Sequence, residues 1–267
     1  MRLWLQSAAT LDRDPRWAVY RRELQAHAGA VARAGTHVEV HGTEVMVPEI
    51  DYPYVEYLHT RQFIEMGLAA EQGGFSGFVL NCWDDPGLTE LRSLLEIPVV
   101  SIGESSMLVA TMLGERFGLV ARNERVGARV WRNVTAYGLG SRAVPPVYCR
   151  VSLPDLGQAF AEPEPIIARF MEAGRQALAR GAEVLLPACG VLNLLLRANK
   201  VVKVDDAPVM DGTAVALKLA EAMVDLWTAG LGVSRKTRFA RPPNHVIATV
   251  RRVYGQGAGA PAEPGSR

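Results

Sequence analysis

Long apolar runs and an excess of charge of one sign are both missing from this chain of 267 residues. No stretch approaches the roughly 20 consecutive apolar residues that a membrane helix needs. The apolar start Leu3-Trp4-Leu5 is too short for a signal peptide. The formal net charge is only +1, which argues against nucleic acid or an anionic membrane as the main partner. We therefore expect a cytoplasmic protein that binds a small-molecule substrate.

Cysteines are scarce as well: the chain has three of them. Three cysteines in a chain of this length do not make a disulfide framework. None of them lies in a Cys-x-x-Cys motif, and no histidine stands at ligand spacing from Cys82 or Cys189, so a redox motif and a zinc site are both disfavoured. The glycine-containing turns near residues 73 and 181 lack a G-x-G-x-x-G or P-loop pattern. We expect neither a metal nor a cofactor.

What the chain does have is a 49% apolar content, enough for substantial cores, arranged in strand-like and helix-like segments that alternate. Strands are predicted at 2–6, 36–41, 78–80, 97–103, 117–121, 147–152 and 207–212, and a further strand leads from Ala182 towards Cys189. This alternation predicts an α/β fold with mostly parallel sheets flanked by helices. The pattern restarts near residue 117, which divides the chain into two lobes. We expect residues 1–103 plus about 208–254 in the first lobe, 104–207 in the second, and a disordered tail at 255–267.

Two stretches with matching layouts organise the chain. In each, an apolar strand leads to a cysteine and then to a helix-like segment, at Asn81–Gly87 and at Ala182–Gly190. In the first stretch Asp85 and Pro86 are suited to the N-cap and first position of a helix. The repeated layout suggests a duplicated unit. In a parallel sheet, ligands bind at the carboxyl ends of the strands, where Cys82 and Cys189 are expected.

Two facing thiols have a specific chemical use. A helix N-terminus and nearby backbone N–H groups lower the pKa of a thiol, which makes its thiolate a better base. One thiolate can remove a proton from one face of a carbon acid while the opposite thiol protonates the other face, which inverts the centre without a cofactor. Backbone N–H groups after each cysteine would stabilise the enolate-like intermediate.

Simpler interpretations stand beside this one. A buried cysteine is usually a small hydrophobic residue, which is our interpretation of Cys149 in the expected strand 147–152. Cys82 and Cys189 would deserve the same interpretation without their matched positions, and a disulfide between them is a further rival. Asp84 is either a substrate-steering carboxylate or a solvated loop residue. Asp85 is most simply a helix cap.

The motif Cys82-Trp83-Asp84-Asp85-Pro86-Gly87-Leu88, followed by Ile97–Glu104, resembles the aspartate/glutamate/hydantoin racemase superfamily and most closely its hydantoin racemase branch. The opening Met1–Ser7 is similar to that branch too, and the resemblance extends to about Tyr254. It implies two pseudosymmetric Rossmann-like α/β lobes with an active-site cleft between them. It also implies a cofactor-independent mechanism in which Cys82 and Cys189 are the two bases. We further expect a homo-oligomer.

The resemblance also implies substrate-binding groups just after the strands, to which Asp84 is added as the neighbour of Cys82. The expected set is Gln6, Ser7, Trp83, Asp84, Glu104, Gly190 and Val191. The amino-acid racemases follow their cysteines with Asn-Thr or Thr-Glu, which this chain lacks, so free aspartate and glutamate are disfavoured. The second motif, Ala188-Cys189-Gly190-Val191, departs from the Gly-Cys-Ala/Thr-Gly usual in the hydantoin branch.

The sequence therefore predicts a racemase or epimerase acting on a carbon next to a carbonyl, in a 5-substituted hydantoin or a related compound. One alternative is a maleate-type cis-trans isomerase that uses a single nucleophilic cysteine. A second is a non-catalytic protein that binds a small molecule on the same fold. An arylmalonate-type decarboxylase, which needs one cysteine, is disfavoured because both thiols are present.

Overall fold

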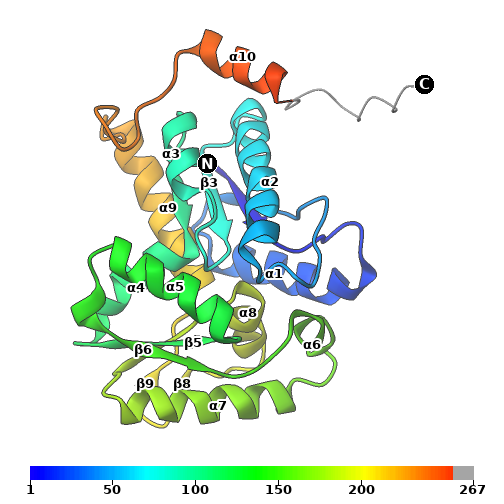
Figure 1. Ribbon diagram of the computed structural model, residues 1–267, viewed down its shortest axis with the longest axis vertical. Coiled ribbons are helices and arrows are strands. Elements are labelled where there is room, and N and C mark those ends of the chain that lie inside the picture. Colours follow the sequence, from blue (N-terminus) through cyan, green and yellow to red (C-terminus); the bar gives the residue numbers. More distant parts are fainter. Residues whose placement is uncertain (255–267) are drawn as a thin grey trace.

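Two parallel sheets form the centre of the protein in a computed structural model that describes residues 1–254 (Figure 1). The first sheet has the strand order β2-β1-β3-β4 and the second the order β6-β5-β7. Their bounds are β1 Arg2–Ser7, β2 His37–His41, β3 Gly77–Asn81, β4 Val99–Ser101, β5 Phe117–Ala121, β6 Ala143–Tyr148 and β7 Val184–Pro187. The tail predicted at 255–267 lies outside the described residues.

The second sheet repeats the order of the first, with β5, β6 and β7 in the places of β1, β2 and β3. Val209 forms a parallel bridge to Leu185 of β7, in the place where β4 pairs with β3. Every residue of β3 and β5 is buried, as expected for strands of a sheet covered on both faces. The predicted α/β fold with two parallel sheets flanked by helices is confirmed.

Helices connect the strands and cover the sheets. The described chain has α1 Ala18–Val31, α2 Pro53–Gln72, α3 Leu88–Leu94, α4 Ile102–Leu113, α5 Glu124–Ala136, α6 Leu153–Gln158, α7 Glu164–Ala179, α8 Gly190–Ala198, α9 Gly212–Thr228 and α10 Asn244–Val253, with 3-10 turns η1 Pro15–Trp17 and η2 Gly140–Arg142. Asn123 caps α5 by accepting from the Val126 N–H. The last long helix, α9, packs on β3 and against α1 and α4.

Two strand predictions, at 147–152 and at 207–212, were right only in part. The first strand is β6 at Ala143–Tyr148, so Cys149 follows the strand instead of lying inside it. Pro145 and Pro146 argue against a strand at this place, because proline has no N–H group to donate to a neighbouring strand. The strand forms because β6 is an edge strand and the β5–β6 register shifts beside the two prolines, so no hydrogen bond of the ladder needs these N–H groups. At 207–212, β9 Ala207–Pro208 pairs antiparallel with β8 Lys203–Val204, and α9 begins at Gly212.

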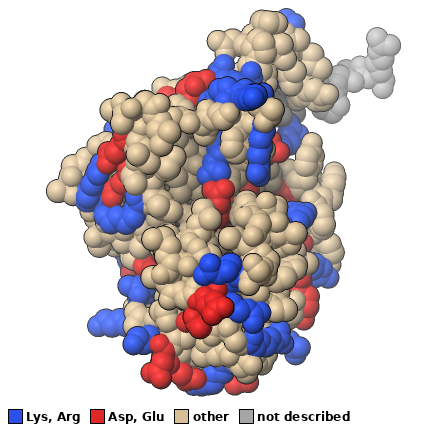
Figure 2. Space-filling view, turned by 90° about the vertical axis from the view of Figure 1, so that its left-hand side faces the viewer, with Lys and Arg blue, Asp and Glu red and all other residues tan. Residues whose placement is uncertain are grey.

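The segment after α9 runs along the end of α3 to α10, which lies at the upper end of the molecule in Figure 1. Arg235 donates to the Arg92 and Leu95 carbonyls, both 2.6 Å away, and so caps the C-terminal turn of α3. None of the described helices has the length and apolarity to cross a membrane. On the face drawn in Figure 2, acidic and basic side chains alternate without forming one field of a single charge.

Candidate active site

A cavity lies where the carboxyl ends of β1, β3, β5 and β7 converge, with an empty volume of about 570 Å³ that includes open solvent at its mouth. Cys82 and Cys189 both line it. Seven of the nine residues expected at the site line this cavity: Ser7, Cys82, Trp83, Asp84, Cys189, Gly190 and Val191. Residues far apart in the sequence thus meet at one point, as the strand-end rule for parallel sheets requires.

Gln6 and Glu104, the other two expected residues, do not line the cavity. The Gln6 side chain is fully buried, accepts from Trp4 Nε1 at 2.8 Å and donates to the Ser7 carbonyl at 2.9 Å. Glu104 forms a two-bonded ion pair with Arg92, with Nη1–Oε1 at 2.9 Å. Both side chains are engaged within the protein instead of facing the cavity.

Cys189 stands at the N-cap position of α8, as the sequence predicted. A Cβ atom on the next residue, Gly190, would come within 2.7 Å of the Asn81 carbonyl oxygen, so only glycine lets α8 start this close to the end of β3. Burial raises the pKa of the Cys189 thiol, while the charge of Arg122 and the N–H groups of Leu192 and Val191 act to lower it.

Cys82 follows β3 directly, but no helix begins beside it, contrary to the prediction. The helix α3 starts only at Leu88, after Gly87 in a left-handed conformation. Asp85 does not cap that helix: its carboxylate accepts from the Gly103 N–H at 3.0 Å and the Tyr137 hydroxyl at 2.7 Å, and also from the Ser101 hydroxyl. The Cys82 turn is therefore held by long-range bonds instead of a helix cap.

The electrostatic surroundings of the two thiols differ. Burial raises the pKa of Cys82 well above its ordinary value, and the negative charge of Asp84 raises it further. For Cys189 the largest influence after burial is the positive charge of Arg122, which lowers the pKa of the thiol. Both cysteines are partly buried, but the environment favours a thiolate at Cys189 over one at Cys82.

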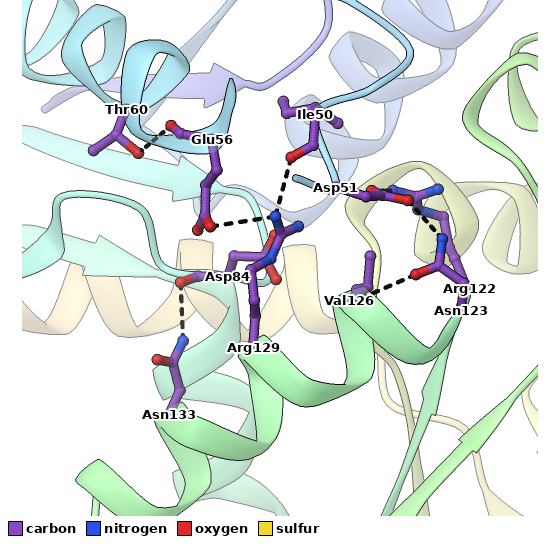
Figure 3. Close-up of polar contacts among 10 residues, drawn as sticks. All are labelled: Ile50, Asp51, Glu56, Thr60, Asp84, Arg122, Asn123, Val126, Arg129 and Asn133. Carbon is purple, nitrogen blue, oxygen red and sulfur yellow. Dashed lines mark hydrogen bonds and ion pairs between the residues drawn. The ribbon is translucent and has the colours of Figure 1, made fainter. Parts of the chain in front are cut away.

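Asp84 is a largely buried ion-pair partner, so the interpretation of a solvated loop carboxylate was wrong. Its Oδ2 accepts from Arg129 Nη2 at 2.6 Å, and its carbonyl accepts from Asn133 Nδ2 at 2.9 Å. Arg129 also binds Glu56 Oε2 at 3.2 Å and the Ile50 carbonyl at 3.0 Å (Figure 3). Burial raises the pKa of Asp84, and Arg129 opposes that rise.

A second buried ion pair lies beside the first. Arg122, which is 5% exposed and lines the cavity, pairs with Asp51, whose other oxygen accepts from Asn123 Nδ2 at 2.5 Å. Figure 3 shows both groups of contacts, which join α5 and the two residues before it to residues 50–56 and to Asp84. Sequence reasoning missed Arg122, although it directly follows the last residue of β5. The strand-end rule, applied to every strand, would have found it.

The cavity also has an apolar wall that includes Trp17, Met46 and Leu153. Tyr20 lines the cavity too. Cys149 stays buried outside the cavity, with Sγ 3.4 Å from the Ala121 carbonyl, in keeping with a packing residue. Within residues 1–254, no cluster of three or more His, Cys, Asp or Glu side chains is arranged to hold a metal ion.

Comparisons with known proteins agree with this architecture. The family model described as Asp/Glu/Hydantoin racemase matches residues 18–220. A hydantoin racemase from Pseudomonas sp. (strain NS671) is 31% identical over 200 residues, which are 74% of this chain and 78% of that protein. The allantoin racemase from Klebsiella pneumoniae superposes with a TM-score of 0.74 at 25% identity, over 91% of this chain and 94% of that one. The allantoin racemase from Pseudomonas fluorescens, at 22% identity, shares the fold with a TM-score of 0.75 over 91% and 97% of the chains.

Proposed function

Because the chain belongs to the Asp/Glu/hydantoin racemase family, and is thereby an isomerase of the racemase type, we propose that Cys82 and Cys189 invert a carbon-acid centre next to a carbonyl without a cofactor. The observation that carries this proposal is that both thiols line one cavity, each just beyond the end of an equivalent strand, β3 or β7. Two bases reaching one site from the two halves of a duplicated fold suit proton transfer on opposite faces of a carbon.

The proton balance of the reaction closes on the two thiols. In one direction the Cys189 thiolate takes the proton from carbon, and the bonding pair moves into the neighbouring carbonyl to give an enolate. The Cys82 thiol then protonates the opposite face, which leaves Cys189 as a thiol and Cys82 as a thiolate. That product state is the one that accepts the opposite enantiomer. The environments of the two thiols favour the state with the thiolate at Cys189 in the free protein.

The proposed substrate is a 5-substituted hydantoin or a related cyclic ureide. Two observations support this class over free aspartate or glutamate: relatives are named hydantoin racemase, and neither Asn-Thr nor Thr-Glu follows Cys82 or Cys189. The cavity is lined by apolar residues such as Trp17 and Met46 and by polar residues such as Ser7 and Arg122, which suits a polar ring that carries a substituent. We propose a cytoplasmic homo-oligomer with lobes at 1–103 plus 208–254 and at 104–207.

Proton NMR in D2O with single enantiomers of a hydantoin panel tests the proposal. In the presence of the wild-type protein, we expect a substrate to lose both its C5 proton signal and its optical rotation. Cys82→Ala and Cys189→Ala should each abolish racemisation, because each removes the proton donor or acceptor of one face. Cys149→Ala is the matched control and should keep the activity. Racemisation in both directions by Cys82→Ala or by Cys189→Ala would contradict the two-thiol mechanism. A covalent adduct of the substrate on one cysteine, seen by mass spectrometry, would favour the maleate-type isomerase.

A further inference from the structure

The hydroxyl group of Tyr20 is a buried polar group in the cavity that the two-thiol mechanism does not use. Tyr20 lies on α1, is 1% exposed and lines the same cavity as Cys82 and Cys189. Its oxygen is 3.3 Å from Asn81 Nδ2 and 3.4 Å from Ser7 Oγ. A buried hydroxyl has one proton to donate, so the partner of that proton decides what Tyr20 does.

A chain of hydrogen bonds sets the direction in which Tyr20 can donate. It begins at the Gly212 N–H, which can only donate and binds Asn193 Oδ1 at 2.9 Å. The amide orientation of Asn193 is thereby fixed, and its Nδ2 donates to Thr213 Oγ1 at 3.2 Å. The Thr213 hydroxyl donates in turn to Asn81 Oδ1 at 3.0 Å, so Asn81 must present Nδ2 to the oxygen of Tyr20.

The Tyr20 oxygen therefore accepts from Asn81, and its own proton is left for the cavity side. The only other neighbour in the described contacts is Ser7, whose hydroxyl donates to the Tyr20 oxygen at a long 3.4 Å while its own oxygen accepts from the Ala9 N–H at 3.2 Å. Each bond in such a chain polarises the next, so the terminal hydroxyl is a stronger donor than an isolated one. Burial raises the pKa of Tyr20, so the hydroxyl keeps its proton across the working pH range.

We propose that the Tyr20 hydroxyl donates a hydrogen bond to the substrate carbonyl oxygen as that oxygen gains enolate charge, with Asn81, Thr213 and Asn193 acting as positioning residues. The proposal rests on the racemase function above and adds a catalytic group to it. A fixed donor aimed at developing charge stabilises the transition state more than the bound substrate. Tyr20 transfers no proton: the two thiols carry that step.

Tyr20→Phe tests the donor directly. Because one such donor typically contributes about 10²- to 10³-fold to kcat, we expect kcat to fall by that factor while KM changes much less. Tyr57→Phe, on the exposed start of α2, is the matched control and should leave both constants unchanged. Circular dichroism and thermal unfolding show whether the variants keep the fold. An unchanged kcat in folded Tyr20→Phe would overturn the inference and leave the two-thiol racemase standing.

Thr213 tests the chain of bonds behind the donor. Thr213 is fully buried and does not line the cavity, so it can affect the Tyr20 hydroxyl only through Asn81. Thr213→Val should lower kcat, and Thr213→Ser, which keeps the hydroxyl, should restore it. In the double variant with Tyr20→Phe, Thr213→Val should add no further loss, because the group it positions is gone. A loss that adds fully would show that Thr213 has only a structural role.

A binding measurement separates this inference from the racemase itself. The probe is 5-benzylidenehydantoin, which is planar at C5 like the enolate and cannot lose a C5 proton. Isothermal titration should show weaker binding to Tyr20→Phe than to the wild type, with Tyr57→Phe unchanged. That result would support the donor even if no hydantoin is racemised. Equal binding to the wild type and Tyr20→Phe, or no binding to either, would overturn it.

Discussion

At the scale of single residues, the two thiols are matched in position but not in charge. The positive charge of Arg122 lowers the pKa of Cys189, whereas the negative charge of Asp84 raises the pKa of Cys82. The N–H groups at the start of α8 add to the effect of Arg122, whereas Cys82 has no helix N-terminus beside it. The site is therefore asymmetric before any substrate binds.

This asymmetry predicts different alkylation rates in the free protein. Iodoacetamide reacts with thiolates, so Cys189 should be alkylated faster than Cys82, because the charge of Arg122 lowers the pKa of Cys189 while the charge of Asp84 raises that of Cys82. Arg122→Gln should slow Cys189 several-fold and leave Cys82 unchanged. Peptide mass mapping over time measures both rates in one sample, and buried Cys149 reports unfolding if it reacts. Faster alkylation of Cys82 would contradict the assignment.

At the scale of elements, the turn that carries Cys82 depends on Asp85. Asp85 has a positive φ of 51° and receives bonds from β4, α4 and Tyr137, just beyond α5. Burial, with a smaller effect of Glu104, raises the pKa of Asp85 to about 7. A Cβ atom on Gly103 would lie 2.5 Å from Asp85 Oδ1, so this close approach also requires glycine.

The raised pKa of Asp85 predicts how stability depends on pH. The folded protein binds this proton more tightly than the unfolded chain, so the stabilisation is complete below the ordinary pKa near 4 and is lost as pH rises toward 7. The slope from one proton is at most about 1.4 kcal/mol per pH unit. Asp85→Asn, which mimics the protonated carboxyl group, should lack this slope. Urea unfolding of both proteins from pH 4 to 8 measures it, and parallel curves would contradict the prediction.

The strand-end cysteines were predictable from sequence because local signals place them. An apolar run followed by a small polar segment marks the end of a parallel strand, and that pattern located β3, β7 and seven of the residues that line the cavity. Tyr20 was not found because its partner Asn81 lies 61 residues away. Asp85 was misread for the same reason, since its bonds are long-range and outweigh the local N-cap preference of Asp before Pro.

At the scale of the whole molecule, the two sheets are joined across the cavity by buried ion pairs. Arg129 of α5 binds Asp84 beside the first sheet and Glu56 of α2, and Arg122 after β5 binds Asp51. The side chain of Arg129 is 8% exposed and that of Asp84 is 13% exposed. Removing one partner of such a group leaves the others charged and buried, which costs more than the intact pair contributes.

Arg129→Met is therefore expected to lower the free energy of unfolding by about 3–5 kcal/mol, because it leaves Asp84 and Glu56 without their shared cation. The matched control is Arg175→Met, whose pair with Asp205 is half exposed on both sides and should matter little. Urea unfolding at neutral pH measures both variants. Adding Asp84→Asn to Arg129→Met should recover part of the loss, because one of the two uncompensated carboxylates is then gone. Equal effects of Arg129→Met and Arg175→Met would show that the buried network does not hold the two sheets together.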